Sequence, residues 1–264
     1  MANNSGFRNA VSWIRSIFLL APLIYVYTMA MGTLSLLASV FDETGRAQHW
    51  FARSWSWLIL KTCFSPVQVI GTEKIAAQGD RPHVFASNHI SALDIPVLYV
   101  HVPNQFRIIA KKELFKYPFL GWHLRRSGQL PIDQSNPSSA IRSLRKAVET
   151  LRDGMPLMIF PEGGRSRSGQ IQSFMSGAFY LAIKAHADII PLAIVGTYEI
   201  LPMNTFHIRP GRIELVVGNP ISTEGMGLHD IENVAARVQQ AIEEMYYSRS
   251  QVPDPRKLAA SSGT

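Results

Sequence analysis

The chain has 264 residues, of which 47% are hydrophobic and only 17% charged, and its formal net charge is +7. This length suits one sizeable domain with an appendage, and the low charged fraction indicates a membrane segment. The positive charge favours an anionic partner, but no nucleic-acid-binding motif is recognisable, so we expect no nucleic-acid partner.

The first apolar stretch is predicted to enter a membrane. No charged residue occurs from Ser16 to Phe41. As a helix this run would be about 39 Å long, enough to cross a hydrocarbon layer of ~30 Å. It is too long for the hydrophobic region of a cleaved signal peptide. Pro22 and Gly32 interrupt it, so a kinked or partly inserted helix is the alternative.

A second apolar stretch, from Trp50 to Phe64, is short for a membrane span and carries tryptophans and basic residues. This composition is typical of the head-group level. We therefore expect residues 1–65 to form a membrane-anchoring helix pair embedded from one side. The alternative is that the second helix packs on the domain as a core helix. Cys63, the only cysteine, is expected to be a packed apolar residue.

Beyond residue 65 the pattern alternates between strands and helices. Short β-branched or apolar runs bounded by turn residues predict strands at 83–87, 106–110, 157–160, 189–195 and 213–217. The clearest helix begins at Asn136-Pro137, a cap followed by proline at the first helical position, and ends at Gly154. Residues 174–187 and 230–247 are also predicted to be helices.

This alternation predicts an α/β fold with a mixed, largely parallel sheet and flanking helices. We place the domain at residues 66–250. The remaining residues, 251–264, are expected to be a disordered tail because they are polar and small.

Polar clusters follow three of the predicted strands, where α/β sheets bind ligands. The first contains His89 and Asp94. Histidine can take a proton from a hydroxyl near neutral pH when a carboxylate orients its ring. The two side chains would diverge on one helix, but they can meet if His89 lies in the loop and Asp94 in the first helical turn. In the alternative, Asp94 is an N-cap residue with a structural role only.

The second cluster contains Lys111 and Lys112, which either bind an anion or form a solvated face. The third runs from Phe160 to Gly169 and combines glycines, arginines and serines. Free backbone N–H groups and arginine can form a phosphate cradle; a basic surface turn is the alternative. The loop is neither a P-loop nor a nucleophile elbow, so Ser166 is not placed as a nucleophile.

In this order, the clusters resemble the four sequence blocks of the glycerolipid acyltransferases. The matching segments are Asn88-His89 with Asp94, Lys112-Glu113-Leu114 with Pro118 and Gly121, Phe160-Pro161-Glu162-Gly163 with Arg165-Ser166, and Ile190 to Ile194. Within this family the chain looks most similar to bacterial-type 1-acyl-sn-glycerol-3-phosphate acyltransferases. The resemblance also implies the N-terminal membrane-associated helix pair.

The resemblance implies that His89 is the general base and that Asp94 orients its ring. Lys112 and Arg165 would hold the phosphate of a lysophospholipid acceptor, while Gly163, Gly164 and Ser166 shape the cradle and Glu162 braces it. The hydroxyl oxygen would attack an acyl thioester directly, either acyl-coenzyme A or acyl-carrier protein as co-substrate, so no acyl-enzyme is needed. No cofactor or metal is expected, because His83, His101, His123 and His186 lack ligand spacing. The expected location is a membrane, with the active site facing the cytoplasm (the inner membrane in a bacterium).

The sequence departs from the family pattern at two positions. Gly164 stands where threonine is usual, and Gln134 follows Pro131-Ile132-Asp133 where arginine is usual. The missing cation leaves open another acceptor, such as a lyso-ornithine lipid. The same residues are also compatible with a lipid hydrolase that activates water with His89 and Asp94. A non-catalytic protein that binds anionic membranes would explain the charge and the apolar helices, but it would not need His89 and Asp94.

Overall fold

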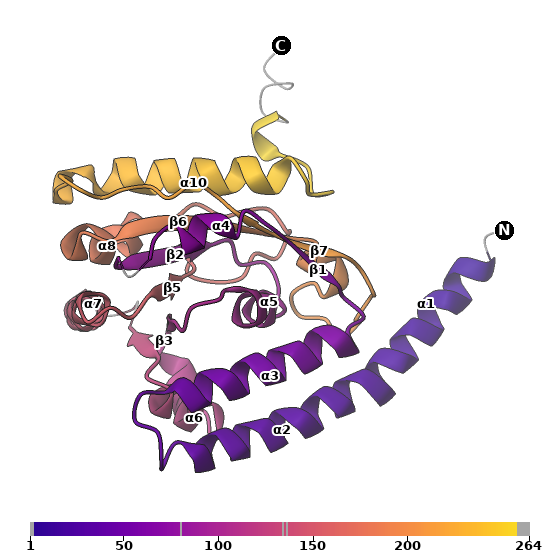
Figure 1. The fold of residues 1–264 in the computed structure, drawn as a ribbon. Coiled ribbons are helices and arrows are strands. Elements are labelled where there is room, and N and C mark those ends of the chain that lie inside the picture. The colour runs from indigo at the N-terminus through magenta and orange to yellow at the C-terminus, as the bar shows by residue number, and fades with distance from the viewer. Residues whose placement is uncertain (1–2, 80, 134, 136, 258–264) are drawn as a thin grey trace.

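A seven-stranded sheet forms the middle layer of the protein (Figure 1). The fold is known from a computed structural model, which describes residues 3–79, 81–133, 135 and 137–257. The strands are β1 (Val67–Ile70), β2 (His83–Ser87), β3 (Arg107–Lys111), β4 (Leu130–Ile132), β5 (Leu157–Ile159), β6 (Asp188–Val195) and β7 (Ile213–Val217). Their order across the sheet is β1-β7-β6-β2-β5-β3-β4.

The sheet is mixed and mostly parallel, which confirms the predicted class. Strands β6, β2, β5, β3 and β4 run in one direction, whereas β7 pairs antiparallel with β6 and parallel with β1. The five predicted strands are all present, and only β1 and β4 were not predicted. Both are short edge strands. Strand β4 contains Pro131, a residue that a sheet tolerates at its edge because proline cannot donate a ladder hydrogen bond.

Helices cover both faces of the sheet (Figure 1). One face carries α7 (Pro137–Arg152), α8 (Tyr180–Ala185) and α10 (Ile231–Tyr247), and the other carries α3 (Arg46–Thr62) and α5 (Asp94–His101). Shorter elements are α4 (Glu73–Ala76), η2 (Lys112–Lys116), α6 (Leu120–Arg126), η3 (Ser176–Phe179), α9 (Thr197–Ile200) and η4 (Leu228–Asp230). The cap predicted at Asn136 lies outside the described residues.

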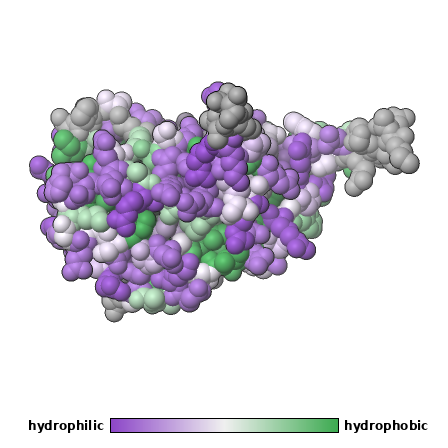
Figure 2. Space-filling view, turned by 90° about the horizontal axis from the view of Figure 1, so that it is seen from above, coloured by the Kyte–Doolittle hydropathy of each residue, from purple (hydrophilic) through white to green (hydrophobic). Residues whose placement is uncertain are grey.

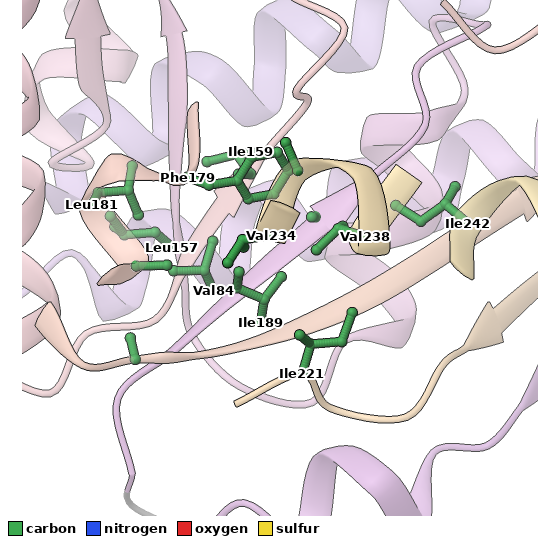
Figure 3. Packing of buried hydrophobic residues seen from close by; sticks show 14 of the residues in the cluster. Val84, Leu157, Ile159, Phe179, Leu181, Ile189, Ile221, Val234, Val238 and Ile242 are labelled. Atoms are coloured by element: carbon green, nitrogen blue, oxygen red, sulfur yellow. The ribbon is translucent and has the colours of Figure 1, made fainter. Parts of the chain in front are cut away.

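Two apolar cores lie on the two faces of the sheet. Strand β2 contributes to both, because successive side chains of a strand point to opposite faces. Val84 and Ala86 belong to the core beneath α7, α8 and α10, which also contains Phe179 and Val238 (Figure 3). Phe85 belongs to the core beneath α3 and α5. Since β2 is buried along its whole length, the loop that follows it starts from a fixed point.

The N-terminal region contains one long apolar helix. Helix α1 (Asn3–Arg15), the π-helical turn η1 (Ser16–Leu20) and α2 (Ala21–Ala38) follow one another without a break. In the described part of the chain, the stretch Asn9–Ala38 is the one helix long and apolar enough to cross a membrane, and few of its residues are buried.

The predicted pair of membrane helices is therefore wrong. Helix α3 packs between α2 and α5 and buries Ala52, Ile59 and Leu60 in the domain core. It has the composition of an interfacial helix because its other side carries exposed Trp50 and Trp57. The alternative interpretation, a core helix packing on the domain, describes it correctly.

Within the segment predicted as a tail, the described residues 251–257 fold back onto the domain. Val252 packs against the α10 side core. Arg256 forms an ion pair with Glu243 of α10 at 3.2 Å and another with Asp254 at 2.8 Å.

Candidate active site

The polar clusters meet at one edge of the sheet. The neighbouring parallel strands β6, β2, β5 and β3 all end at this edge, so the residues that follow them lie side by side. In that order the strand ends bring Thr197, His89, Glu162 and Lys111 to the same edge. Open α/β sheets bind ligands at the carboxyl ends of their strands.

His89 and Asp94 form the hydrogen-bonded pair that the sequence suggested. His89 lies in the loop after β2, and Asp94 is the first residue of α5. The distance from His89 Nδ1 to Asp94 Oδ2 is 2.8 Å. With Nδ1 donating to Asp94, the lone pair is on Nε2, which has no hydrogen-bond partner in the described part of the chain. The side chain of His89 is 17% exposed, so this nitrogen is available to a hydroxyl from solution.

Asp94 is held by more than the histidine. Its Oδ2 also accepts hydrogen bonds from the backbone N–H groups of Ile90, at 2.8 Å, and Ser91, at 2.9 Å. Its Oδ1 accepts one from the hydroxyl of Thr197, at 2.7 Å. Asp94 is completely buried. The carboxyl group is therefore fixed in one orientation, and it fixes the imidazole in turn.

The local sequence explains why the pair can form around Pro96. Because α5 begins at Asp94, Pro96 lies in the first helical turn, where no backbone N–H is needed. The bond from the Ser91 N–H to Asp94 is one half of a capping box. The Ser91 hydroxyl accepts from the Leu93 N–H and donates to the Leu201 carbonyl instead. Asp94 thus supports the turn and orients His89 at the same time.

Two further contacts fix the loop that carries His89. The side chain of Asn88 donates to the Ile194 carbonyl at 2.9 Å and accepts from the Ile194 N–H at 2.8 Å, which ties the loop to β6. The ring of Phe160 stacks on the imidazole of His89, with 4.2 Å between the ring centroids. The imidazole consequently has little freedom to turn away from the site.

Glu162 connects the histidine loop to the arginine loop. Its Oε1 accepts from the His89 N–H at 2.6 Å, and its Oε2 accepts from the Gln172 N–H at 2.9 Å. Burial raises the pKa of this carboxyl group to about 7, and the two backbone hydrogen bonds oppose the shift. The contacts are those of a brace between loops, the part that the resemblance implied for Glu162.

The arginine loop has both occupied and free backbone donors. Gly163 adopts a left-handed conformation with φ of 72°, which favours glycine, and its N–H donates to the Phe160 carbonyl. Ser166 is buried, and its N–H donates to the His89 carbonyl at 2.9 Å. Within the described residues, the N–H groups of Gly164 and Arg165 and the Arg165 guanidinium have no partner. These are the donors of the predicted phosphate cradle that remain available to a ligand.

The two lysines after β3 have different surroundings. Lys112 Nζ pairs with Asp133 Oδ2 at 2.9 Å. Hydrogen bonds from Ser135 and Lys112 lower the pKa of Asp133 to about 2. Lys111 Nζ instead lies beside the arginine loop, 3.4 Å from the place that a Cβ atom at Gly164 would occupy. Its ammonium group has no ion-pair partner in the described part of the chain.

The structure thus brings His89, Asp94 and the arginine loop together, with Lys112 turned towards Asp133. Sequence reasoning missed Thr197 entirely, because a threonine after a buried strand has no distinctive spacing. It treated Lys111 only as one of two adjacent lysines. Gln134, the departure from the acyltransferase pattern, lies outside the described residues.

Comparison with known proteins identifies the chemistry to which this arrangement is related. Residues 66–195 match the family described as Acyltransferase. A 1-acyl-sn-glycerol-3-phosphate acyltransferase of Chlamydomonas reinhardtii is 33% identical over 202 residues, which cover 76% of this chain and 59% of that protein. The enzyme of the same name from Saccharomyces cerevisiae is 29% identical and is matched over 89% of this chain and 80% of its own length.

A solved structure matches as well. The crystal structure of the 1-acyl-sn-glycerophosphate (LPA) acyltransferase of Thermotoga maritima aligns with a TM-score of 0.75 at 26% sequence identity, covering 90% of this chain and 98% of the other. The chain spans between half and six-tenths of the length of the first algal and plant relatives. Sequence and fold agree that the chain belongs to the acyltransferase family.

Proposed function

We propose that the protein transfers a fatty acyl group from acyl-coenzyme A or acyl-carrier protein to the free hydroxyl of 1-acyl-sn-glycerol-3-phosphate, which yields phosphatidic acid. The observation that carries the proposal is the geometry around His89. His89 Nδ1 is bonded to the buried carboxyl group of Asp94 at 2.8 Å, which leaves Nε2 beside a loop whose Arg165 has no partner within the described residues. The relatives named above are enzymes of this reaction.

In the proposed reaction, His89 Nε2 takes the proton from the acceptor hydroxyl. The hydroxyl oxygen attacks the thioester carbonyl, the new ester bond forms, and the thiol leaves with a proton returned by the imidazolium. Asp94 stabilises the imidazolium and keeps Nε2 directed at the acceptor. A side-chain nucleophile is not needed.

The acceptor phosphate is proposed to bind at the arginine loop. Among the described residues, the Arg165 guanidinium and the N–H groups of Gly164 and Arg165 are free donors, and Lys111 Nζ is near Gly164. Arginine suits this position because its planar group can donate two parallel hydrogen bonds to one phosphate. Lys112, which the family pattern nominates, would act from its ion pair with Asp133. Gly163, Ser166 and Glu162 would hold the loop in shape.

The N-terminal helix supports a membrane location. Its exposed apolar surface along Asn9–Ala38 suits a lipid environment, where a lysolipid acceptor resides. We propose that the active site faces the cytoplasm, where soluble acyl thioesters are available. Removal of residues 1–45 should weaken membrane binding, because it removes this apolar helix. Helix α3 stays in place to complete the core.

The decisive experiment is a product analysis. Purified protein is incubated with lysophosphatidic acid and an acyl thioester, and the lipids are identified by mass spectrometry. Phosphatidic acid that appears only when the thioester is present supports the proposal. Fatty acid released without a thioester would identify a hydrolase, and product from a lyso-ornithine lipid alone would identify another acceptor.

A further inference from the structure

A patch of large apolar side chains is exposed beside the active-site edge, on the segment that follows β3. It consists of Leu114, Tyr117, Phe119, Leu120 and Trp122, which are 38–59% exposed; we call it the α6 patch. The rings of Phe119 and Trp122 lie 5.3 Å apart between centroids. These side chains cover no part of the core, so their composition needs another explanation.

The backbone beneath the patch is tightly packed. Buried Phe115 anchors η2, and α6 lies directly on it, because a Cβ atom at Gly121 would overlap the Phe115 carbonyl. Phe119 is the centre of a tight turn with φ of 58° and ψ of −61°, closed by the Leu120 N–H bond to the Pro118 carbonyl at 2.6 Å. This conformation is strained for a bulky residue.

The α6 patch continues the apolar surface of the N-terminal helix. Helices α2 and α6 are in contact, and Ser35 Oγ of α2 lies 3.0 Å from His123 Nδ1 of α6. The end of α2 and the turn after it add exposed Leu37, Val40 and Phe41, the last 92% exposed. The side of α10, by contrast, presents mainly polar side chains (Figure 2). The exposed apolar surface therefore continues from α2 onto α6.

The charges around the patch are those of a membrane interface. Lys116, Arg125 and Arg126 are exposed beside the aromatic side chains, while Glu113 is the only acidic residue between Lys111 and Gln129. Aromatic residues with flanking lysine and arginine are typical of the head-group level, and clustered cations favour anionic lipids. A soluble acidic partner would match the cations but not the exposed rings.

We propose that the α6 patch is a second membrane contact, which inserts Tyr117, Phe119, Leu120 and Trp122 into the head-group region of an anionic leaflet. Because η2 follows Lys111 directly, this contact holds the active-site edge at the depth of lipid phosphates. An acceptor lysolipid could then reach His89 without leaving the leaflet. This last consequence rests on the proposed function, but the membrane contact itself does not.

The insertion can be measured without any activity. Cys63 is the only cysteine and is completely buried, so a Tyr117→Cys protein can carry one environment-sensitive fluorophore. In vesicles of phosphatidylethanolamine and phosphatidylglycerol, we expect a blue-shifted emission and quenching by lipids brominated near the head group. Glu232→Cys, at an exposed position of α10, is the matched control and should remain solvent-like.

A solvent-like probe at position 117, together with a quenched probe at Leu37→Cys on α2, would overturn the proposal. A blue shift that appears without vesicles and grows with protein concentration would also overturn it, and it would assign the patch to self-association. With activity as a second readout, Phe119→Ser/Trp122→Ser should raise the apparent KM for long-chain acceptor in vesicles by about tenfold. Turnover of a monomeric short-chain acceptor should stay unchanged, and equal losses with both acceptors would contradict the inference.

Discussion

The histidine loop and the arginine loop adjoin each other in the site but are held in opposite ways. Around His89, nearly every polar group has a partner: Asp94 accepts four hydrogen bonds and Asn88 makes two to β6. Around Arg165, the guanidinium and the nearby Lys111 ammonium have none within the described residues. The first loop is fixed before any ligand arrives, whereas the second keeps its donors free for one.

This difference follows from what each loop has to do in the proposed reaction. A general base works only when its ring is correctly oriented, so its position must be set by the protein. A phosphate brings its own strong acceptors, so the cations that bind it must not be neutralised beforehand. Substitutions in the histidine loop should therefore change kcat, and substitutions in the arginine loop should change the acceptor KM.

The largest effect is expected for His89→Ala. Loss of a positioned general base should lower kcat by roughly 10²–10⁴-fold, with the fold retained because His89 is not in an apolar core. Steady-state kinetics and circular dichroism measure the two quantities. Undiminished turnover by a well-folded variant would remove His89 from the mechanism.

A substitution of Arg165 by lysine tests the other side of the comparison. Lysine keeps the charge but loses the paired donors, so the acceptor KM should rise by about tenfold while the donor KM stays near its original value. Arg167→Lys, in the same loop, is the control. Equal acceptor KM values for wild type and Arg165→Lys would exclude Arg165 from the phosphate site.

The two adjacent lysines offer a matched pair. Lys111→Ala should raise the acceptor KM more than Lys112→Ala, because Lys112 is already paired with Asp133 at 2.9 Å. The same kinetic assay compares them. The opposite ranking would return the phosphate contact to Lys112, the residue that the family pattern indicates.

Thr197 provides a finer test of the fixed loop. Thr197→Val keeps the shape but removes the hydroxyl that donates to Asp94 at 2.7 Å, and a lost bond of this kind corresponds to about a tenfold fall in kcat. The pH profile of kcat/KM should shift with it, and Thr197→Ser should restore both. If Thr197→Val lowers stability but leaves the pH profile of kcat/KM unchanged, Thr197 has only a structural role.

Glu162, the brace between the two loops, is tested through stability and not through activity. Burial raises the pKa of Glu162 from 4.5 to about 7, so the folded protein retains a proton that the unfolded chain releases. The free energy of unfolding contributed by this group should therefore fall as pH rises from 4.5 to about 7, by up to about 3 kcal/mol.

The variant Glu162→Gln tests this sign. It should unfold more easily, by about 1–3 kcal/mol, because its amide cannot accept from both His89 and Gln172. Its stability should also vary less with pH across the same interval, as measured by urea unfolding. An unchanged pH dependence would show that Glu162 does not titrate in that interval.

The sequence by itself determined the strands that pass through the core, because their short apolar or β-branched runs are bounded by turn residues. It also determined the residue types of the His89–Asp94 pair and of the arginine loop. It left β1 and β4 undetected, since short edge strands have little pattern. It misjudged α3, because tryptophans on an exposed side and apolar residues on a buried side have the composition of an interfacial helix.

Only the tertiary structure decided which polar groups meet. The order of β6, β2, β5 and β3 places Thr197 and Asp94, far apart in the chain, within hydrogen-bonding distance. It likewise directs Lys112 to Asp133 and Lys111 to Gly164. A sequence pattern cannot tell which of two adjacent lysines faces the site. The direction of each side chain depends on the strand register and on the partners that the fold supplies.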